Sequence, residues 1–336
     1  MIENKDGMQE DEQERDPRQK DKRPVEANDE ARSAHVSDED TTGTPEEEES
    51  LTADVSPDVA PLVEEFMEQA AQQNEAAAEA VPDVKNKPGA YISFEHVSKS
   101  FGDLVVLDDV SFCVDPGETL CLMGRSGVGK SVSLQILMGF LKPDKGVVRV
   151  AGEDICCLSE KELQAVRRKV TMVFQNGALF DSISVGENVA FPLRERGELA
   201  EEQIMQVVKG LLEMVGVAGM EDLLPSDLST GMKRSVAIAR ALAAQPEAIL
   251  YDEPTTMVDP LMAHLLGELI ERLKQQLHLT SLVVTHDTRF AKKLADRVVL
   301  LHKGKALFFG TMEEMEQSED PVLQEFLALD ALTVPV

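Results

Sequence analysis

The chain contains 336 residues, and 62 acidic against 33 basic side chains give it a formal net charge of −29. Such a charge repels phosphate, so we exclude nucleic acid as a partner. No apolar run approaches the about 18–20 residues needed to cross a bilayer, and residues 1–20 are polar, so we expect neither a membrane span nor secretion. The four cysteines show no C-x-x-C spacing, which favours a reduced chain with incidental thiols.

The beginning of the chain differs in composition from the rest. Acidic runs such as Glu46–Glu49 and a scarcity of apolar clusters predict disorder. Between residues 61 and 82 the composition turns to Ala, Glu and Gln, and Leu62 and Phe66 fall on one helical stripe. We therefore expect residues 1–90 to form a disordered acidic extension with a short helix at 61–82. That helix either binds a partner or lies as a marginal helix in the solvated tail.

From residue 91 onward, strand-like and helical patterns alternate along the chain. Ile204, Val208 and Leu211 show helical periodicity, and Ser159-x-x-Glu162 and Thr311-x-x-Glu314 are typical of capping boxes that open helices. Buried apolar strands linked by helices predict an α/β fold with a largely parallel sheet, and the β-rich start adds an antiparallel piece. The strand-like runs are Tyr91–Val97, Leu107–Val114, Glu118–Met123, Gly146–Val150, Val170–Phe174, Ala248–Asp252, Ser281–Thr285, Arg297–His302 and Lys305–Phe309.

A glycine-rich segment follows the apolar strand that ends at Met123. It matches the phosphate-binding pattern G-x-x-x-x-G-K-[ST], and helical periodicity continues after it. Backbone N–H groups at the glycines and at the helix N-terminus can surround a phosphate, Lys130 can reach the β- and γ-phosphates, and the Ser131 hydroxyl can ligate Mg²⁺. The segment predicts a nucleotide-phosphate site made of Gly124, Arg125, Ser126, Gly127, Val128, Gly129, Lys130 and Ser131.

A second acidic element lies at the end of the apolar run Ala248–Tyr251. Asp252 ends this strand and Glu253 follows it, at the sheet edge where α/β proteins bind ligands. Asp252 is suited to hold Mg²⁺ through water, and Glu253 is suited to polarise a water that attacks the γ-phosphate. Because the phosphate-binding loop is also present, we interpret this pair as part of a hydrolytic site and not as two solvated surface carboxylates.

These motifs together resemble those of the ATP-binding subunits of ABC transporters, over about residues 91–310. The resemblance implies the fold of a P-loop NTPase, with a RecA-like core, an antiparallel β-subdomain and a helical subdomain at about residues 176–245. Residues 311–336 then form a C-terminal helical extension. The resemblance also implies ATP hydrolysis coupled to transport, with ATP and Mg²⁺ as cofactors.

Several single residues match the family's nucleotide-contacting positions. Phe101 follows the first strand and matches the aromatic side chain that stacks on adenine. Gln175 follows the strand at 170–174 and matches the Q-loop glutamine, which senses Mg²⁺ and the attacking water and borders the groove for the membrane subunit. His286 follows the strand at 281–285 and matches the switch histidine that contacts the γ-phosphate.

Other matches imply a second copy of the chain. Leu228–Met232 matches the family signature, in which Ser229 and Gly231 face the γ-phosphate bound by the other copy; free N–H groups at a helix N-terminus make such an anion site. Asp259 matches the D-loop residue between the copies. The resemblance therefore implies a head-to-tail pair with each ATP held between two copies.

The sequence departs from the family pattern at three places. Thr230 stands where the signature usually has Gly and Met232 where it usually has Gln, and residues 256–258 differ from the usual residues before the D-loop Asp. A Cβ at residue 230 crowds a backbone that normally approaches phosphate closely. We still expect hydrolysis, at a rate that is slow or depends on a partner.

The segments 174–182 and 188–195, the pair Gly231-Met232 and the terminal segment 320–327 resemble the Mla/MCE phospholipid-transport ATPases. This implies a permease subunit above each copy, an MCE-type lipid-binding protein beyond the membrane and a small STAS-type accessory subunit. It also implies a peripheral location on the cytoplasmic face of the inner membrane.

Three alternatives remain open. One is an ABC importer or exporter for another solute. A second is a soluble ABC ATPase, although the single P-loop and the absence of a coiled-coil insertion between residues 132 and 227 argue against the translation and chromosome types. A third is a P-loop kinase, which would not need the signature or the histidine at position 286.

Overall fold

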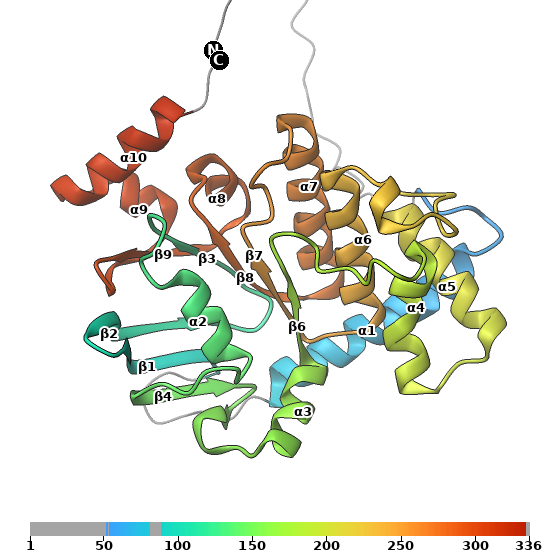
Figure 1. Ribbon diagram of the computed structural model, residues 1–336, viewed down its shortest axis with the longest axis horizontal. Coiled ribbons are helices and arrows are strands. Elements are labelled where there is room, and N and C mark those ends of the chain that lie inside the picture. The colour runs from blue at the N-terminus through green and yellow to red at the C-terminus, as the bar shows by residue number, and fades with distance from the viewer. Residues whose placement is uncertain (1–51, 53, 81–88, 334–336) are drawn as a thin grey trace, which may run out of the picture. The chain divides into compact units, whose positions relative to one another are not determined.

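The apolar runs of the sequence form two sheets (Figure 1). The computed structural model describes residues 52, 54–80 and 89–333, all of which belong to one compact unit, Glu48–Val336. The acidic run at Glu46–Glu49, for which we expected disorder, lies outside the described residues.

The larger sheet has six strands in the order β10-β9-β3-β8-β7-β6. The pairs β9–β3, β3–β8, β8–β7 and β7–β6 are parallel, whereas β10 pairs antiparallel with β9 at one edge. The predicted α/β architecture is confirmed. The strands are β3 (Thr119–Met123), β6 (Val170–Val173), β7 (Ala248–Asp252), β8 (Thr280–Thr285), β9 (Arg297–His302) and β10 (Lys305–Gly310).

The smaller sheet is antiparallel and has the order β2-β1-β4-β5, which confirms the antiparallel piece. Phe94 and Phe112 stack across its first pair of strands, with ring centroids 4.5 Å apart. Every strand expected from the sequence is present in one of the two sheets, and the two-residue β5 is an addition. The strands are β1 (Ile92–Phe101), β2 (Leu104–Val114), β4 (Lys145–Val150) and β5 (Glu153–Asp154).

Helices connect the strands and pack on the larger sheet. The capping boxes expected at Ser159 and Thr311 are both present, and Ser184 opens another helix in the same way. None of the described helices is long and apolar enough to cross a membrane. The helices are α1 (Ala60–Ala80), α2 (Lys130–Leu137), α3 (Glu160–Lys169), α4 (Val185–Arg196), α5 (Glu201–Met214), α6 (Thr230–Ala243), α7 (Pro260–Leu277), α8 (Thr288–Leu294), α9 (Met312–Gln317) and α10 (Pro321–Thr333), with 3-10 turns at Ile155–Cys157 and Pro225–Asp227.

The larger sheet separates two hydrophobic cores. In β3, Leu120 and Leu122 belong to the core shared with α2, α3 and the antiparallel sheet, whereas Cys121 and Met123 belong to the core shared with the other helices. Successive side chains of a strand point to opposite faces, so a strand covered on both faces needs apolar residues throughout. This explains why the parallel strands read as continuous apolar runs.

Helix α1 lies outside the ATPase-like region of the sequence but packs on it, against α5 and α7 (Figure 1). Val63 and Phe66 of its apolar stripe are buried, and the amide Nδ2 of Asn74 donates a hydrogen bond of 2.7 Å to the carbonyl oxygen of Leu277. An isolated helix of this length is barely stable in water, so the packing stabilises it. This burial differs from the solvated tail helix that was one of our two expectations.

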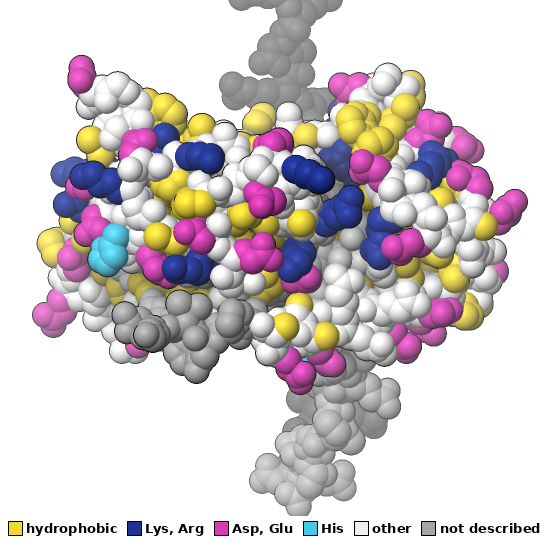
Figure 2. Space-filling view, turned by 90° about the horizontal axis from the view of Figure 1, so that it is seen from below, with side chains coloured by type: hydrophobic (Ala, Val, Ile, Leu, Met, Phe, Trp, Pro, Cys, Tyr) yellow, Lys and Arg dark blue, Asp and Glu magenta, His cyan; other side chains and the backbone are white. Residues whose placement is uncertain are grey.

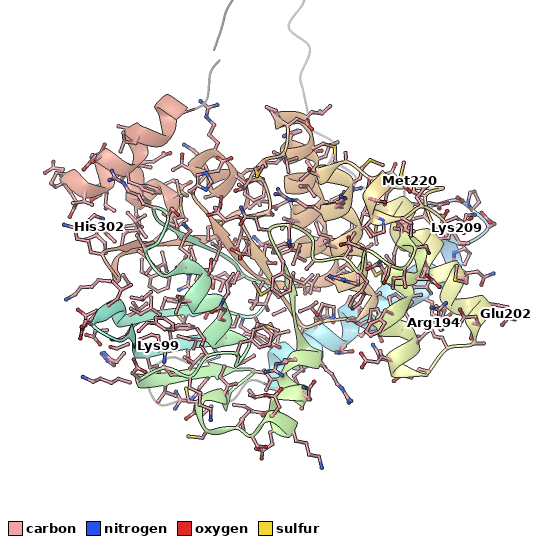
Figure 3. The ribbon with its side chains drawn as sticks, viewed as in Figure 1. Lys99, Arg194, Glu202, Lys209, Met220 and His302 are labelled. Carbon is pink, nitrogen blue, oxygen red and sulfur yellow. The ribbon has the colours of Figure 1, made fainter. Side chains whose placement is uncertain are left out.

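Charged side chains of both signs cover the surface of the described part. On the face seen in Figure 2, basic and acidic side chains lie among one another, with small apolar areas between them. Ion pairs join some of them: Arg194 Nη2 lies 2.5 Å from Glu201 Oε1. Figure 3 shows Arg194 and Lys209 projecting from the helices at one side of the molecule.

Candidate nucleotide site

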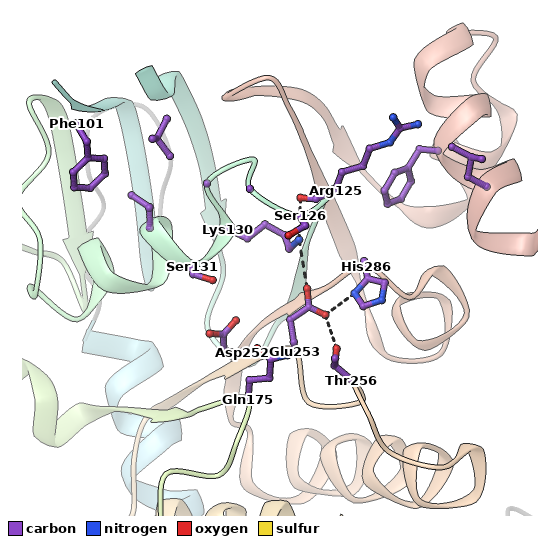
Figure 4. Close-up of a pocket in the computed structure, with 16 residues that line it drawn as sticks. Phe101, Arg125, Ser126, Lys130, Ser131, Gln175, Asp252, Glu253, Thr256 and His286 are labelled. Carbon is purple, nitrogen blue, oxygen red and sulfur yellow. Dashed lines mark hydrogen bonds and ion pairs between the residues drawn. The ribbon is translucent and has the colours of Figure 1, made fainter. Parts of the chain in front are cut away.

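The carboxyl ends of four parallel strands meet at one edge of the larger sheet. β3 leads into the glycine-rich loop, β6 into Gln175, β7 into Glu253 and β8 into His286. These strands are hydrogen-bonded neighbours, so segments that are far apart in the sequence line one cavity of about 770 Å³ (Figure 4). Its walls are formed by Phe101, Val106, Arg125, Ser126, Gly127, Gly129, Lys130, Ser131, Val132, Gln175, Asp252, Glu253, Thr256, His286, Phe326 and Leu329.

Two glycines shape the loop between β3 and α2. Gly124 has a φ of 147°, and a Cβ on it would lie 2.6 Å from the carbonyl oxygen of Leu301. Gly129, the N-cap of α2, has a left-handed φ of 109°, and its Cβ would lie 2.6 Å from a methyl group of Leu107. Only glycine fits both places without strain. The loop therefore leads directly into a helix N-terminus, whose free N–H groups and dipole favour an anion.

Lys130 is the first residue of α2 and is buried at the base of the cavity. Its ammonium Nζ donates to the carbonyl oxygens of Gly124 at 2.6 Å and Arg125 at 3.2 Å, and it lies 3.4 Å from Glu253 Oε1. A buried ammonium needs such partners because desolvation is costly. The contacts hold the cation beside the loop, where an anionic ligand can reach it.

Glu253 contacts three other side chains of the cavity, those of Lys130, Thr256 and His286. Its Oε2 accepts hydrogen bonds from Thr256 Oγ1 at 3.0 Å and His286 Nδ1 at 2.7 Å, as the dashed lines of Figure 4 show. An ionised carboxylate only accepts, so Nδ1 is assigned the proton. Glu253 has a φ of 48°, an uncommon value for a residue other than glycine, and its N–H bonds to the carbonyl oxygen of Val284 at 2.9 Å. The strained turn directs its side chain into the cavity.

Asp252, the last residue of β7, lies next to Glu253 and is half-buried like it. Burial raises the pKa of Asp252, the charge of Glu253 raises it further, and the charge of Lys130 opposes both. Its Oδ1 is buried and has no hydrogen-bond partner among the described residues. A buried carboxylate oxygen without a partner fits a cation in the cavity, because buried charges are otherwise paired. The oxygens of Ser131 and Gln175, which line the same cavity, are hard donors of the kind that Mg²⁺ prefers.

Phe101 also lines the cavity, at the end of β1. The residue is 46% exposed, and the ammonium of Lys99 lies 5.5 Å from the centroid of its ring. Figure 4 shows Phe101 on the far side of the loop from His286. Phe101 thus lies away from His286, and a second aromatic side chain, Phe326, also lines the cavity.

The structure does not bring every predicted site residue to this cavity. Gly124 and Val128 belong to the loop without lining the cavity, and Ser229, Gly231 and Asp259 lie outside its walls. Ser229 is exposed and caps α6, where its hydroxyl accepts from the N–H of Met232 at 3.3 Å. Asp259 is exposed and caps α7 in the same manner.

Five lining residues were not predicted from the sequence: Val106, Val132, Thr256, Phe326 and Leu329. Thr256 lies three residues after Glu253, in the segment that departs from the family pattern, and that nearness was the available signal. Phe326 and Leu329 come from α10, about 200 residues after the loop, and Arg125 Nη2 of the loop lies 2.8 Å from Glu325 Oε1 of the same helix. Nothing local in the sequence indicates that α10 reaches this cavity.

Residues 107–256 match the family model described as ABC transporter. The chain is 42% identical over 236 residues to the intermembrane phospholipid transport system ATP-binding protein MlaF of Haemophilus influenzae, which covers 70% of this chain and 89% of that protein. It is 38% identical over 239 residues to the probable ribonucleotide transport ATP-binding protein mkl of Mycobacterium leprae, covering 71% of this chain and 69% of that one. A solved dimer of the ATP-binding cassette MJ0796 in a post-hydrolysis state with ADP and Pi has a TM-score of 0.61 and 30% identity, covering 66% of this chain and 98% of that chain.

Proposed function

Because this chain belongs to the ABC transporter family of ATP-binding subunits, and is an ATP hydrolase of that family, we propose that its hydrolysis drives the movement of phospholipid between membranes. The inference of a phospholipid cargo rests on one observation, the identity of 42% across 89% of a relative named for intermembrane phospholipid transport. A relative named for ribonucleotide transport, at 38% identity, makes another solute the second candidate.

The proposed binding mode for ATP uses both the aromatic and the polar groups of the cavity walls. The adenine ring stacks on the exposed face of Phe101, and the phosphates lie against the N–H groups of the loop and the N-terminus of α2. Lys130 neutralises the β- and γ-phosphates, since its ammonium already lies among the loop carbonyls and 3.4 Å from Glu253. This places the γ-phosphate at the end of the cavity that Glu253 and His286 line.

Mg²⁺ is proposed as the cation of the site, held by Ser131 and Gln175 directly and by Asp252 through water. The buried oxygen of Asp252 that lacks a described partner supports this set. When bound, the ion neutralises charge on the β- and γ-phosphate oxygens.

The proposed chemistry uses Glu253 as the general base. A water between its carboxylate and the γ-phosphorus transfers a proton to the carboxylate while its oxygen bonds to phosphorus. The bond from phosphorus to the bridging oxygen breaks, and ADP and Pi leave. His286, held by its Nδ1 bond to Glu253, contacts the γ-phosphate and stabilises the charge that moves onto its oxygens.

A second copy of the chain is proposed to complete each site. Ser229, Gly231 and Asp259 lie outside the cavity walls of their own chain, and the exposed cap of α6 presents N–H groups suited to an anion. A head-to-tail pair would place that cap against the γ-phosphate held by the other copy. Closure of the pair around ATP then drives the attached subunits between states.

A permease subunit is the proposed partner at the segment after Gln175. Phe180 and Phe191 are 47% and 46% exposed and lie 5.3 Å apart between ring centroids. Asn188 holds the loop rigid by accepting from the N–H of Phe180 at 2.8 Å and donating to its carbonyl oxygen at 3.1 Å. Exposed aromatic side chains on a rigid support are typical of binding surfaces. The proposal further includes an MCE-type protein, a STAS-type accessory subunit and a peripheral position on the cytoplasmic face of the inner membrane.

The partner and cargo are tested by purifying the native complex from detergent-solubilised membranes and identifying its proteins and lipids by mass spectrometry. A permease together with an MCE-type protein and bound phospholipid is expected. A permease of another kind would contradict the phospholipid cargo, and a complex without membrane protein would contradict the transport role.

The base is tested by Glu253→Gln, which keeps the shape of the side chain but cannot accept the water's proton. We expect ATP binding within about twofold of the unchanged protein and steady-state hydrolysis lowered by a factor of about 100 or more. Ser229→Ala, which alters the group supplied to the other copy, should lower turnover and keep ATP binding. Normal steady-state hydrolysis by the Gln variant would show that Glu253 is not the base.

A further inference from the structure

One hydrogen bond at the Glu253 carboxylate has no role in the mechanism above. Oε2 accepts from both His286 and Thr256, whereas Oε1 faces Lys130. His286 and Lys130 are expected to engage the γ-phosphate once ATP is bound. Of these three partners, Thr256 is the one to which the mechanism assigns no contact with the γ-phosphate, so its hydroxyl serves the Glu253 carboxylate alone.

The backbone around Thr256 folds it onto Glu253. The N–H of Thr256 donates to the carbonyl oxygen of Glu253 at 3.3 Å, and the Thr256 hydroxyl donates to Glu253 Oε2 at 3.0 Å. The two residues are therefore joined through both main chain and side chain in one tight turn. A carboxylate held on one oxygen by a short local side chain has few rotamers left, which reduces the cost of orienting it for reaction.

Arg234 holds this turn from helix α6. Its guanidinium donates to the carbonyl oxygens of Pro254 and Thr256, and its Nε donates to the carbonyl oxygen of Gln175 at 3.1 Å. Arg234 is 2% exposed, and burial lowers the pKa of its guanidinium while the charge of Glu253 opposes that effect. One rigid fork of donors thus joins the helix that begins at the signature to the segments after β6 and β7.

We propose that Thr256 is a positioning residue, whose hydroxyl orients the Glu253 carboxylate toward the attacking water, and that Arg234 holds the Thr256 peptide in place. The proposal rests on the proposed function, in which Glu253 is the base. It makes helix α6 serve two sites: its cap is offered to the other copy, and its fifth residue supports the base of its own chain.

Two substitutions distinguish the proposed positioning role of the Thr256 hydroxyl from a role of Thr256 in packing alone. Thr256→Val keeps the shape and removes the hydroxyl, whereas Thr256→Ser keeps the hydroxyl and removes a methyl group. We expect kcat of the full chain to fall about tenfold in Thr256→Val and to stay within about twofold in Thr256→Ser, because a hydrogen bond to a charged group is worth about that much. The Kd for ATP should change less than about twofold in both variants, and both should melt within a few degrees of the unchanged protein.

The opposite order, with a normal kcat in Thr256→Val and a low one in Thr256→Ser, would overturn the proposal in favour of packing. An equal loss in both variants would also overturn it. Glu253→Gln is measured beside them: if it hydrolyses ATP normally, the proposed base is wrong and this inference falls with it. If Glu253→Gln is inactive while Thr256→Val is normal, the base stands and only the positioning role is lost.

Arg234 is tested by Arg234→Lys, which keeps the charge but not the fork of donors. We expect kcat to fall about tenfold with ATP binding retained, and Arg234→Lys combined with Thr256→Val to be less than additive, because both disturb the same carboxylate. If the losses of kcat in the two single variants were fully additive in the double variant, Arg234 would not act on Glu253 through Thr256. Circular dichroism at the assay temperature establishes that the buried substitution leaves the chain folded.

Discussion

Helices α1 and α10 both lie outside the ATPase-like region and are attached to it in different ways. Helix α1 packs on α5 and α7 through buried apolar side chains such as Val63 and Met67, on residues outside the walls of the nucleotide cavity. Helix α10 places Phe326 and Leu329 in the walls of that cavity, and its Glu325 pairs with Arg125 of the phosphate-binding loop. Substitutions in α1 should therefore change stability, whereas substitutions in α10 should change nucleotide binding.

The attachment of α1 and of the residues just before it is also polar. Ser56 donates its N–H to the Glu213 carboxylate at 2.7 Å, and Glu213 is 9% exposed. The side-chain amide of Gln245 donates to the carbonyl oxygen of Phe66 at 2.8 Å. Buried polar groups that find partners across the contact favour one register for the packed segment. The surface pair of Arg125 and Glu325 at α10, with side chains 55% and 61% exposed, has no such constraint.

The largest effect is expected for Val63→Asp, which places a charge at a fully buried position of α1. We expect α1 to leave α5, with a loss of about 3 kcal/mol of local stability, because a buried charge without a partner is not tolerated. Hydrogen exchange should then show amide protection over Ala60–Ala80 falling by a factor of about 100. The matched control is Ala76→Asp, at an exposed position of the same helix, which should cost only the helix propensity of about 0.5 kcal/mol. Equal losses in the two variants would contradict the packing of α1.

A second test measures the effect of one substitution in two backgrounds. Gly210 of α5 faces Val63, and a Cβ there would lie 2.1 Å from Val63 Cγ2. Gly210→Ala should therefore lower the free energy of unfolding by about 1–3 kcal/mol through overpacking. In a Val63→Ala background the loss should be smaller, because the γ-methyl groups of Val63 are gone and its Cβ, at 3.2 Å, is the contact that remains. Urea unfolding of the four proteins measures the cycle, and equal losses in the two backgrounds would show that the Val63 side chain does not cover Gly210.

A smaller effect is expected at α10, and on binding. Glu325→Gln removes a carboxylate that competes with phosphate for Arg125, so the Kd for ATP should fall about two- to threefold at low salt, with less change at high salt. Titration with a fluorescent ATP analogue measures it. Glu319→Gln, an exposed position before α10, removes the same charge and should leave the Kd unchanged. A matching gain in both variants would trace the effect to net charge and not to the contact of α10.

The smallest effect is expected for Asp58→Asn. Asp58 forms an ion pair at the surface, in which its Oδ2 lies 2.8 Å from Nζ of Lys209 (labelled in Figure 3). The hydrogen bond from Lys209 lowers the pKa of Asp58 below its usual value of 3.8. A carboxyl group whose pKa is lower in the folded than in the unfolded state stabilises the fold at pH values above its unfolded-state pKa. This stabilisation is lost as the pH falls through the folded-state pKa. Asp58→Asn should therefore lower the melting temperature slightly at pH 7 and not at about pH 2. A change that is independent of pH would assign the effect to something other than this ion pair.

Most of the cavity could be predicted because its parts are local motifs. The glycine-rich loop, the Asp252–Glu253 pair and His286 each stand directly after an apolar strand, and neighbouring parallel strands bring such positions to one edge. Thr256 was missed because its contact depends on a left-handed φ at Glu253, and Phe326 because its partner is far away in the sequence. The packing of α1 was missed for the same reason, since an amphipathic stripe does not say which surface it covers.

By itself, the sequence determined the strands, the capped helices, the phosphate-binding loop and the acidic strand end, because each depends on residues within a few positions of one another. Only the tertiary structure decided that α1 lies on Gly210 of α5, that α10 reaches the nucleotide cavity and that Arg234 holds the turn beside Glu253. Those contacts join residues of large sequence separation, and their geometry depends on shape, burial and hydrogen-bond partners that exist only once the chain has folded.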